Sequence, residues 1–438
     1  MGDIIYRPSE AWISTYSGLT PVGPCASLPN PADLAGVTPK MFSSRLDRDL
    51  SPGRLQRALD ELRAAGTPLV DLTCTNPPQC GLGPAPEALT RALAAPGAAE
   101  YHPNPRGLLS TRQTVARYYA DRGLPTEPDD VFLSASTSQA YADLIKLFAD
   151  PGDEILVPQP SYPLFDMLVT LEGCRPERFP SFYTEPHGWR IDEGALEQAF
   201  TSRTRAVILV SPNNPTGAYL APVEHATIQR LCADRGCPIL LDEVFYDYPA
   251  EGFTPPAPAD EGAGLIVRLN GLSKVVGAPQ IKLGWIRLGG ETALVRTASE
   301  RLEFIADAYL SASTPAQLAA EALLPRRGPI QARILERLSV TQRAAELAFG
   351  HGSPARLLPR EGGWSLVVRL TRGEDDEELA YQLLVEDHVV VQPGFFFDFL
   401  DGEHLVLSLL PPADDFAEGV SRVARRIARR ASELRRQE

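Results

Sequence analysis

The sequence has few cysteines and histidines and no long hydrophobic run, and each of these absences excludes a class of protein. Its six cysteines include no Cys-x-x-Cys pair, so a disulfide framework is not expected. Its six histidines show no metal-ligand spacing, so we expect no metal site. No stretch approaches the roughly 20 apolar residues that span a bilayer, and residues 1–30 lack the apolar core of a secretory signal. These absences together favour a cytoplasmic protein.

Basic residues are also fewer than acidic residues. The 42 basic residues are outnumbered by 56 acidic residues, which gives a formal net charge of −14. A surface of this sign repels nucleic acid and anionic membranes, so neither is expected as a partner. The arginine-rich segment 422–436 is the exception, and we interpret it as the solvated face of a helix.

Lysine is rare, because only Lys40, Lys146, Lys274 and Lys282 occur among the 42 basic residues. Arginine stays protonated in proteins, whereas a lysine can lose its proton and act as an amine nucleophile. The chain uses arginine wherever a plain positive charge suffices, so each retained lysine is a candidate for amine chemistry. Accidental retention is the alternative explanation for all four.

Short apolar runs alternate with helical patterns from about residue 100 onward. Apolar periodicity predicts helices at 111–122, 139–148, 165–172 and 223–234. The runs with strand character are Val131–Leu133, Ile155–Val157, Ala206–Val210, Ile239–Leu241, Leu265–Leu269 and Gly284–Leu288. Buried strands separated by helices predict an α/β fold with a mostly parallel sheet covered on both faces. In such sheets, ligands bind beyond the carboxyl ends of the strands.

The length of 438 residues predicts a large domain and a smaller one. We assign residues 1–44 to a Pro-rich N-terminal arm and residues 101–310 to the large domain. Residues 311–438, with strands near 364–369, 389–391 and 405–409, are assigned to a smaller α+β domain. Residues 45–100 are expected to contribute to the small domain and to a loop beside the ligand site.

Three polar motifs follow successive strands of the predicted sheet. Ser211–Gly217 reads Ser-Pro-Asn-Asn-Pro-Thr-Gly, Asp242 opens Asp-Glu-Val-Phe-Tyr, and Lys274 closes Leu-Ser-Lys. Each motif alone is a weak signal, since an Asn-Pro pair is usually a turn and an Asp after a strand is usually a helix cap. In this order, each at the carboxyl end of a strand, they indicate one shared site.

At these residues the chain resembles the class I/II aminotransferases of pyridoxal phosphate (PLP) fold type I, over about residues 45–430. The resemblance implies PLP as the cofactor, bound by the large domain. It implies that Lys274 forms a Schiff base with PLP and later moves the substrate proton. Asp242 would pair with the pyridine nitrogen, raise its pKa and keep it protonated. Asn214 would hydrogen-bond the phenolic oxygen.

Other segments extend the resemblance. The segment Ser134–Ala140 matches the family's phosphate-binding segment, which implies that Ser136 and Thr137 hold the phosphate at a helix N-terminus. A plain Ser/Thr cap is the alternative for these two residues. Tyr162, in Pro-Ser-Tyr-Pro, matches the aromatic residue that stacks on the cofactor. Tyr101 matches a tyrosine that reaches the phosphate of the neighbouring subunit, which implies a homodimer.

Three positions of the cofactor site depart from the family pattern. Lys282 stands where the family has a phosphate-binding arginine, and we expect it to make a compact single-point contact. Gly271 replaces a hydroxyl residue, for which the adjacent Ser273 is the candidate to compensate. Phe245 replaces a tyrosine and has no hydroxyl to donate, so Asn214 is expected to serve the phenolic oxygen alone.

The fourth departure concerns the substrate. Family members bind the substrate α-carboxylate with an arginine in a small-domain strand, and that position is Val406 in His-Leu-Val-Leu-Ser. Either another arginine takes the carboxylate, with Arg106, Arg45 and Arg369 as candidates, or the substrate has no conventional α-carboxylate.

Two further residues are expected at the substrate end of the site. Asn76 occupies the position of a family loop near the substrate. Phe396 belongs to an aromatic run at 395–399, of which most residues are expected in the core and at least one at the pocket.

The resulting prediction is an aminotransferase that moves an amino group from an amino-acid or amine donor to a 2-oxo acid by a ping-pong mechanism. A PLP lyase, decarboxylase or oxidase is the alternative that Val406 favours, because one scaffold serves many such chemistries. A non-catalytic binding module is the third possibility, although no DNA-binding motif precedes residue 45.

Overall fold

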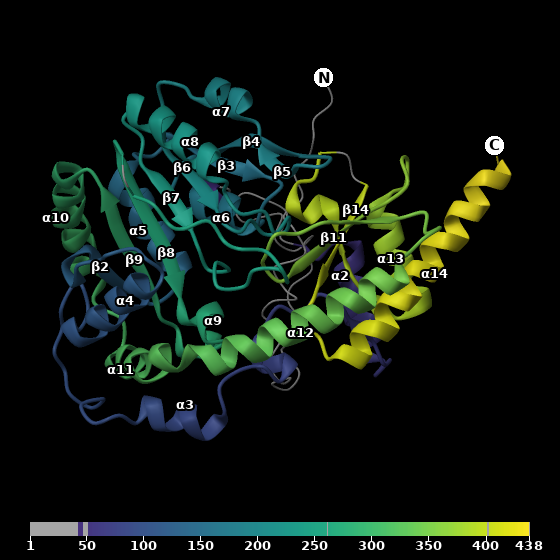
Figure 1. Cartoon of the computed structure of the whole chain (residues 1–438), viewed down its shortest axis with the longest axis horizontal. Coiled ribbons are helices and arrows are strands. Elements are labelled where there is room, and N and C mark those ends of the chain that lie inside the picture. The colour runs from purple at the N-terminus through teal and green to yellow at the C-terminus, as the bar shows by residue number, and fades with distance from the viewer. Residues whose placement is uncertain (1–42, 47–50, 261, 401–402, 438) are drawn as a thin grey trace, which may run out of the picture.

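The computed structural model describes residues 43–46, 51–260, 262–400 and 403–437 (Figure 1). The predicted arm at 1–44 lies outside these ranges except for its last two residues. Among the helices in these ranges, none is both long enough and apolar enough to cross a membrane.

The main sheet has eight strands in the order β2-β9-β8-β7-β6-β3-β4-β5. The pairs β3–β4, β3–β6, β6–β7 and β7–β8 are parallel, whereas β9 is antiparallel to both β2 and β8, and β5 is antiparallel to β4. The strands are β2 (Val131–Ser134), β3 (Glu154–Gln159), β4 (Arg175–Thr184), β5 (Gly188–Ile191), β6 (Thr204–Val210), β7 (Ile239–Asp242), β8 (Leu265–Gly271) and β9 (Gly284–Gly290). The predicted mostly parallel sheet is confirmed, and the β4–β5 hairpin is an element that the apolar pattern did not reveal.

Alternate residues of the central strands pack into cores on opposite faces of the sheet. Ile208 of β6 contacts one core, whereas its neighbours Val207 and Leu209 contact another. This alternation follows from the period of two along a strand, and it explains why both faces need helices. The helices around this sheet are α4 (Leu109–Asp121), α5 (Thr137–Phe148), α6 (Leu164–Leu171), α7 (Glu193–Ala199), α8 (Pro222–Asp234) and α10 (Thr292–Tyr309) (Figure 1).

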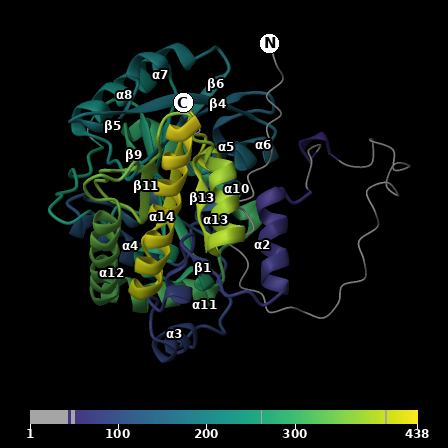
Figure 2. The same ribbon diagram turned by 90° about the vertical axis from the view of Figure 1, so that its right-hand side faces the viewer.

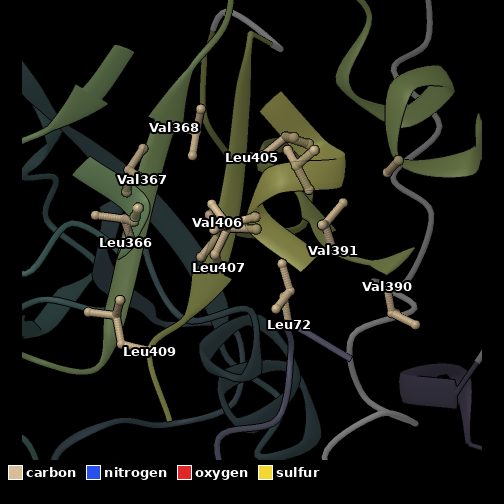
Figure 3. Packing of buried hydrophobic residues seen from close by; sticks show 14 of the residues in the cluster. Leu72, Leu366, Val367, Val368, Val390, Val391, Leu405, Val406, Leu407 and Leu409 are labelled. Atoms are coloured by element: carbon tan, nitrogen blue, oxygen red, sulfur yellow. The ribbon is translucent and has the colours of Figure 1, made fainter. Parts of the chain in front are cut away.

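A second, four-stranded antiparallel sheet forms the small domain, in the order β10-β11-β14-β13. Its strands are β10 (Arg356–Leu358), β11 (Ser365–Arg369), β13 (Gln392–Pro393) and β14 (His404–Ser408). Buried aliphatic side chains of β11 and β14 pack together in its core (Figure 3). The helices α2 (Arg54–Ala64), α13 (Asp376–Asp387) and α14 (Ala413–Gln437) lie side by side, and α13 packs against β13 and β14 of this sheet (Figure 2).

The segment 45–100 divides between the two domains. Strand β1 (Val70–Asp71) pairs with β12 (Val389–Val390), and α2 packs on α13, so this part lies with the small domain. Helix α3 (Pro86–Leu93) instead packs against α11 (Thr314–Leu323), which in turn packs against α4 of the large domain. We therefore propose that the domain boundary falls within the following long helix, α12 (Arg327–Ala348), and not at residue 311.

The carboxyl ends of β2, β3, β6, β7 and β8 meet at one edge of the main sheet, where the antiparallel β9 begins. The first residue of β9, Gly284, approaches the turn after β2 closely. A Cβ atom at this position would lie 2.9 Å from the carbonyl carbon of Ser136 and from the amide nitrogen of Thr137. A larger residue would displace this turn, so glycine is needed for the edge of the sheet to close around the site.

Candidate active site

A cavity of about 570 Å³ lies at this edge of the sheet. Nine residues predicted from the sequence line it, and they come from segments far apart in the chain. They are Asn76, Ser136, Thr137, Tyr162, Asn214, Asp242, Ser273, Lys274 and Lys282. The three motifs that the sequence placed after strands therefore meet at one site.

Lys274 lies in the short helix α9 (Leu272–Val275), directly after β8. Its Nζ donates to the carbonyl oxygen of Thr75 at 3.3 Å and lies 5.0 Å from the Trp364 ring centroid. Tyr248 Oη donates to the Lys274 carbonyl oxygen at 2.6 Å and fixes the backbone there. Burial lowers the pKa of Lys274 to about 8, because a charged amine is poorly solvated in this environment. The neutral, nucleophilic form is therefore more accessible than in an exposed lysine.

Asp242 is the last residue of β7 and is 7% exposed. Its carboxylate accepts hydrogen bonds from the Val244 amide at 3.0 Å and from Tyr141 Oη at 3.0 Å. Burial raises the pKa of Asp242 to about 6, although both hydrogen bonds oppose the shift. The Asp242 carboxylate thus has two neutral hydrogen-bond donors and lines a cavity. Because neither donor neutralises its charge, the arrangement favours a cationic group bound in the cavity.

Glu243, the next residue, is buried and has its charge compensated within the protein. It pairs with Arg268 at 2.6 Å and with Arg122 at 3.1 Å. Burial alone would raise the pKa of Glu243, but the two arginines hold it below its usual range. The backbone carbonyl of Glu243 also accepts from the Asn270 side-chain amide at 3.0 Å. These contacts tie β7 to β8 directly behind Asp242 and Lys274.

The walls beside Asp242 supply an aromatic ring and an amide. Tyr162 follows β3 and packs edge-on against Phe165, with ring centroids 6.2 Å apart. Asn214 follows β6, and its Oδ1 accepts a hydrogen bond from Ser365 Oγ at 3.1 Å. Ser365 is the first residue of β11, so the small domain contributes directly to the cavity.

The N-terminus of α5 forms another wall. Ser136 is its N-cap, and its Oγ accepts from the Gln139 amide at 3.0 Å. The first-turn amides of this 12-residue helix have no intrahelical partner and suit an anion such as a phosphate. Lys282 lines the same cavity from a left-handed backbone position, with φ of 59°. The helix N-terminus and Lys282 thus lie at the same cavity, an arrangement that suits a phosphate group.

Two predicted site residues, Arg106 and Phe396, are placed elsewhere by the structure, and Tyr101 is predicted to act in a neighbouring subunit. Arg106 does not line the cavity, because its guanidinium pairs with Glu303 at 2.7 Å and donates to the Asp129 carbonyl at 2.7 Å. Phe396 is buried in the small-domain core, and none of the phenylalanines at 395–399 lines the cavity. Tyr101 is 77% exposed and does not line the cavity of its own chain.

The other candidate arginines are also outside the cavity. Arg45 donates to the Leu171 carbonyl at 2.6 Å, and Arg369 is exposed at the end of β11. Val406 is 1% exposed and packs among the aliphatic side chains of β11 and β14, opposite Val367 (Figure 3). Among the described residues that line the cavity, the cationic side chains are Lys274 and Lys282.

Sequence reasoning missed several residues of the site. Tyr141 lies one helical turn after Thr137, so a site at the start of α5 could have indicated it. Ser365 and Trp364 come from the small domain, and no local motif marks them. Cys74 and Cys80 flank the loop that contains Thr75, and their sulfurs lie 3.3 Å apart.

These residues fit pyridoxal phosphate. A buried carboxylate with a raised pKa suits a protonated ring nitrogen, a nearby amine with a lowered pKa suits an aldehyde, and the α5 N-terminus suits the phosphate. The model of the family described as aminotransferase class I and II matches residues 68–414.

The chain belongs to this family.

Similar proteins and structures agree with this membership. The alanine aminotransferase of Mycobacterium bovis is 28% identical over 385 residues, which covers 85% of this chain and 88% of the relative. The glutamate-pyruvate aminotransferase AlaA of Escherichia coli is 25% identical over 387 residues, covering 85% and 94%. The structure of an alanine aminotransferase from Pyrococcus furiosus has a TM-score of 0.79 at 24% identity and covers 89% of this chain and 98% of that one. The predicted fold type I is thereby confirmed.

We expect the substitution Asp242→Asn to stabilise the cofactor-free aminotransferase at pH 7. The folded pKa of about 6 exceeds the usual value of about 3.9, so the folded protein binds more protons between these values. The contribution of the Asp242 carboxyl to the free energy of unfolding is therefore fully present below about pH 4. It is lost as the pH rises through about 6. Asparagine keeps an acceptor for Val244 and can donate to Tyr141. The gain at pH 7 is expected to be about 2–3 kcal/mol.

Urea unfolding of both cofactor-free proteins between pH 4 and 8 tests this expectation. The difference in free energy of unfolding between variant and wild type should shrink toward pH 4. Asp307→Asn, at an exposed position in α10, is the matched control and should show no such trend. A difference that is independent of pH would contradict the assignment of the burial penalty to Asp242.

Proposed function

We propose that this PLP-dependent aminotransferase uses Lys274 as the lysine that binds its cofactor. The observation that supports the proposal is that Lys274, Asp242 and Asn214 line one cavity at the carboxyl edge of the main sheet. When bound, PLP supplies an electron sink for the carbanion that forms when the substrate loses its α-proton. The remaining tasks fall to side chains of this chain.

Each lining residue has a task that follows from its chemistry. The amine of Lys274, with its lowered pKa, takes the α-proton and returns it at a different carbon. Asp242 holds a proton on the ring nitrogen, because a carboxylate in this buried position stabilises a neighbouring cation. Asn214 donates to the phenolic oxygen, and Tyr162 packs against the ring face. Lys282 and the α5 N-terminus, with Ser136 and Thr137, bind the phosphate.

The amino donor is proposed to be an amine without a conventional α-carboxylate. None of the described residues that line the cavity is an arginine, and Val406 is a core residue. The wall that remains for a substrate has amide groups at Asn76 and Gln79 and apolar groups at Pro78 and Pro279. Such a wall recognises neutral polar and apolar groups of a substrate better than it recognises a carboxylate.

Two further features of the proposal concern assembly and location. Tyr101, exposed on its own chain, is proposed to reach the phosphate in a second copy of the chain, which makes the active unit a homodimer. The scarcity of cysteine and the five free thiols among the described residues fit a reducing compartment, so a cytoplasmic location is proposed.

Replacement of Lys274 tests the cofactor linkage. Purified wild-type protein reconstituted with PLP should be yellow and should retain the cofactor after borohydride reduction. Lys274→Ala should lose the covalent adduct completely, because the other lysine among the described residues that line the cavity, Lys282, is assigned to the phosphate. The matched control is Lys146→Ala, which removes a lysine that pairs with Glu172 on the surface of the large domain. An adduct that survives in Lys274→Ala would assign the linkage to a different amine.

A panel of amino donors tests the substrate class and separates transamination from the alternative PLP chemistries. We expect conversion to the pyridoxamine form with amines that lack an α-carboxylate, and little conversion with common α-amino acids. The measurement is the loss of the visible absorbance of the bound cofactor under single-turnover conditions. Efficient conversion by alanine or glutamate would contradict the proposed donor class while leaving Lys274 as the linkage. Release of carbon dioxide or ammonia without conversion would favour a lyase, decarboxylase or oxidase.

A further inference from the structure

Asn214 has one hydrogen bond that crosses between the domains. Its Oδ1 accepts from Ser365 Oγ at 3.1 Å, and the two residues are 151 positions apart in the sequence. In an asparagine side chain, the acceptor oxygen and the donor NH₂ group lie in one plane and point in different directions from Cγ. Because Ser365 holds Oδ1, the NH₂ group is directed to the other side. Asn214 lines the cavity, and among the described residues Ser365 is the hydrogen-bond partner of its side chain.

The direction of the Asn214 amide matters more in this protein than in a site where a second side chain also donates to the phenolic oxygen of PLP. Phe245 lines the cavity without a hydroxyl group, so it offers nothing to the phenolic oxygen of PLP. If the Asn214 amide were reversed, its oxygen would face the phenolic oxygen and repel it. With no hydroxyl at position 245, stabilisation of that oxygen depends more strongly on the orientation of the Asn214 amide.

Ser365 is well placed to fix this orientation. It begins β11, whose backbone is paired with β14 from Ser365 to Arg369. Next to it, the Trp364 carbonyl oxygen accepts from the Leu409 amide at 2.8 Å. The serine hydroxyl thus projects from a strand that is anchored in the small-domain sheet, whereas Asn214 belongs to the large domain.

We propose that Ser365 is a positioning residue that orients the Asn214 amide toward the phenolic oxygen of the cofactor. Through this contact, the placement of the small domain determines how well that oxygen is stabilised. The inference rests on the proposed cofactor site, and it assigns to β11 a task beyond packing the small domain.

The pH at which the lysine-linked cofactor loses its proton reports on this contact. When the lysine-linked cofactor loses its proton, the negative charge of its phenolic oxygen is no longer compensated. A hydrogen bond from Asn214 stabilises this charge, so loss of the donor should raise the pKa of the lysine-linked cofactor. Asn214→Ala should raise the midpoint of the visible absorbance change by about one to two pH units. Ser365→Ala frees the amide without removing it, so its midpoint should rise by about half to one unit.

A double-mutant cycle separates positioning from a general structural effect. In the Asn214→Ala background, Ser365→Ala should cause no further shift, because the group that it orients is gone. Ser365→Thr keeps the hydroxyl and should restore the wild-type midpoint. Thr371→Ala removes a small-domain hydroxyl that donates to the Pro354 carbonyl oxygen, and it is the control that should change nothing.

The outcomes distinguish this inference from the proposed function. A wild-type protein that binds no PLP would overturn the proposed function itself. A wild type with a clear midpoint that Ser365→Ala leaves unchanged would overturn only the role of Ser365. A shift of the same size in the presence and absence of Asn214 would also overturn it, because Ser365 would then act by another route.

A second observation concerns the pair Cys74 and Cys80. Cys80 Sγ donates to Cys74 Sγ at 3.3 Å, and this contact lowers the pKa of the Cys74 thiol to about 7. Cys74 is half-buried and Cys80 is buried. A disulfide bond is about 2.05 Å long, so a shift on the order of 1 Å would bring the sulfurs within bonding distance.

The segment between the two cysteines lines the active site. Thr75, Asn76 and Gln79 face the cavity, and the Thr75 carbonyl accepts from Lys274 Nζ. Drawing Cys74 and Cys80 together would move this segment. We infer that the two cysteines form a reversible disulfide with a hydroperoxide as oxidant, and that the disulfide changes the surroundings of Lys274.

The reaction balances for one equivalent of hydroperoxide. The Cys74 thiolate attacks a peroxide oxygen, the O–O bond breaks, and a sulfenic acid and a hydroxide or alkoxide form. The Cys80 sulfur then attacks the Cys74 sulfur, the S–O bond breaks, and water leaves with the Cys80 proton. The two thiols lose two electrons, and the peroxide gains them.

Peptide mapping after treatment of the PLP-bound protein with hydrogen peroxide tests this inference. We expect one Cys74–Cys80 cross-link that dithiothreitol reverses, together with a change in the visible circular dichroism of the cofactor. Cys80→Ser and Cys80→Ala should both abolish the cross-link and the spectral change, whereas Cys174→Ser should retain them. Oxidation of Cys74 to a sulfinic acid without a cross-link, or a cross-link without a spectral change, would overturn the inference.

Discussion

The burial of one carboxylate, that of Asp242, is the constraint on which the rest of the site depends. Asp242 is the last residue of β7 and Glu243 follows it, and these two consecutive acids have different partners. Glu243 meets two arginines and is fully compensated within the protein. Asp242 meets only neutral donors. The fold thus leaves one acid for a ligand to neutralise and keeps the other as a fixed support behind it.

The packing of the small domain determines which side chain stands at position 406. The small-domain sheet packs valine and leucine where related enzymes are expected to have an arginine, and Val406 lies opposite Val367 in that core. A guanidinium at this position would need a partner inside an aliphatic cluster. Position 406 is therefore part of the small-domain core, and the proposed recognition of the donor falls to the amides and apolar groups nearer the loop at 75–79.

Much of the large domain could be predicted from the sequence, because its strands are short apolar runs and its site residues follow them directly. The motifs at Asn214, Asp242 and Lys274 were found in this way, since each lies at the carboxyl end of a strand. Arg106 and Phe396 were misplaced for a different reason. Whether an arginine faces a cavity or a glutamate such as Glu303, nearly two hundred positions away, depends on tertiary packing that no local pattern encodes. Ser365 was missed because its contact joins the two domains.

The route of the chain through the two domains also sets the order in which the pocket can be completed during synthesis. The main sheet is finished at Gly290, but the loop at Thr75 is held in place by the pairing of β1 with β12 and by Ser408, whose hydroxyl donates to the Cys74 carbonyl at 2.5 Å. Ser365 also emerges late. When the chain has been synthesised only up to β9, Lys274 and Asp242 are present in the main sheet. The loop at Thr75 is not yet fixed beside them. The cavity is therefore completed only after β12 and Ser408 have been synthesised.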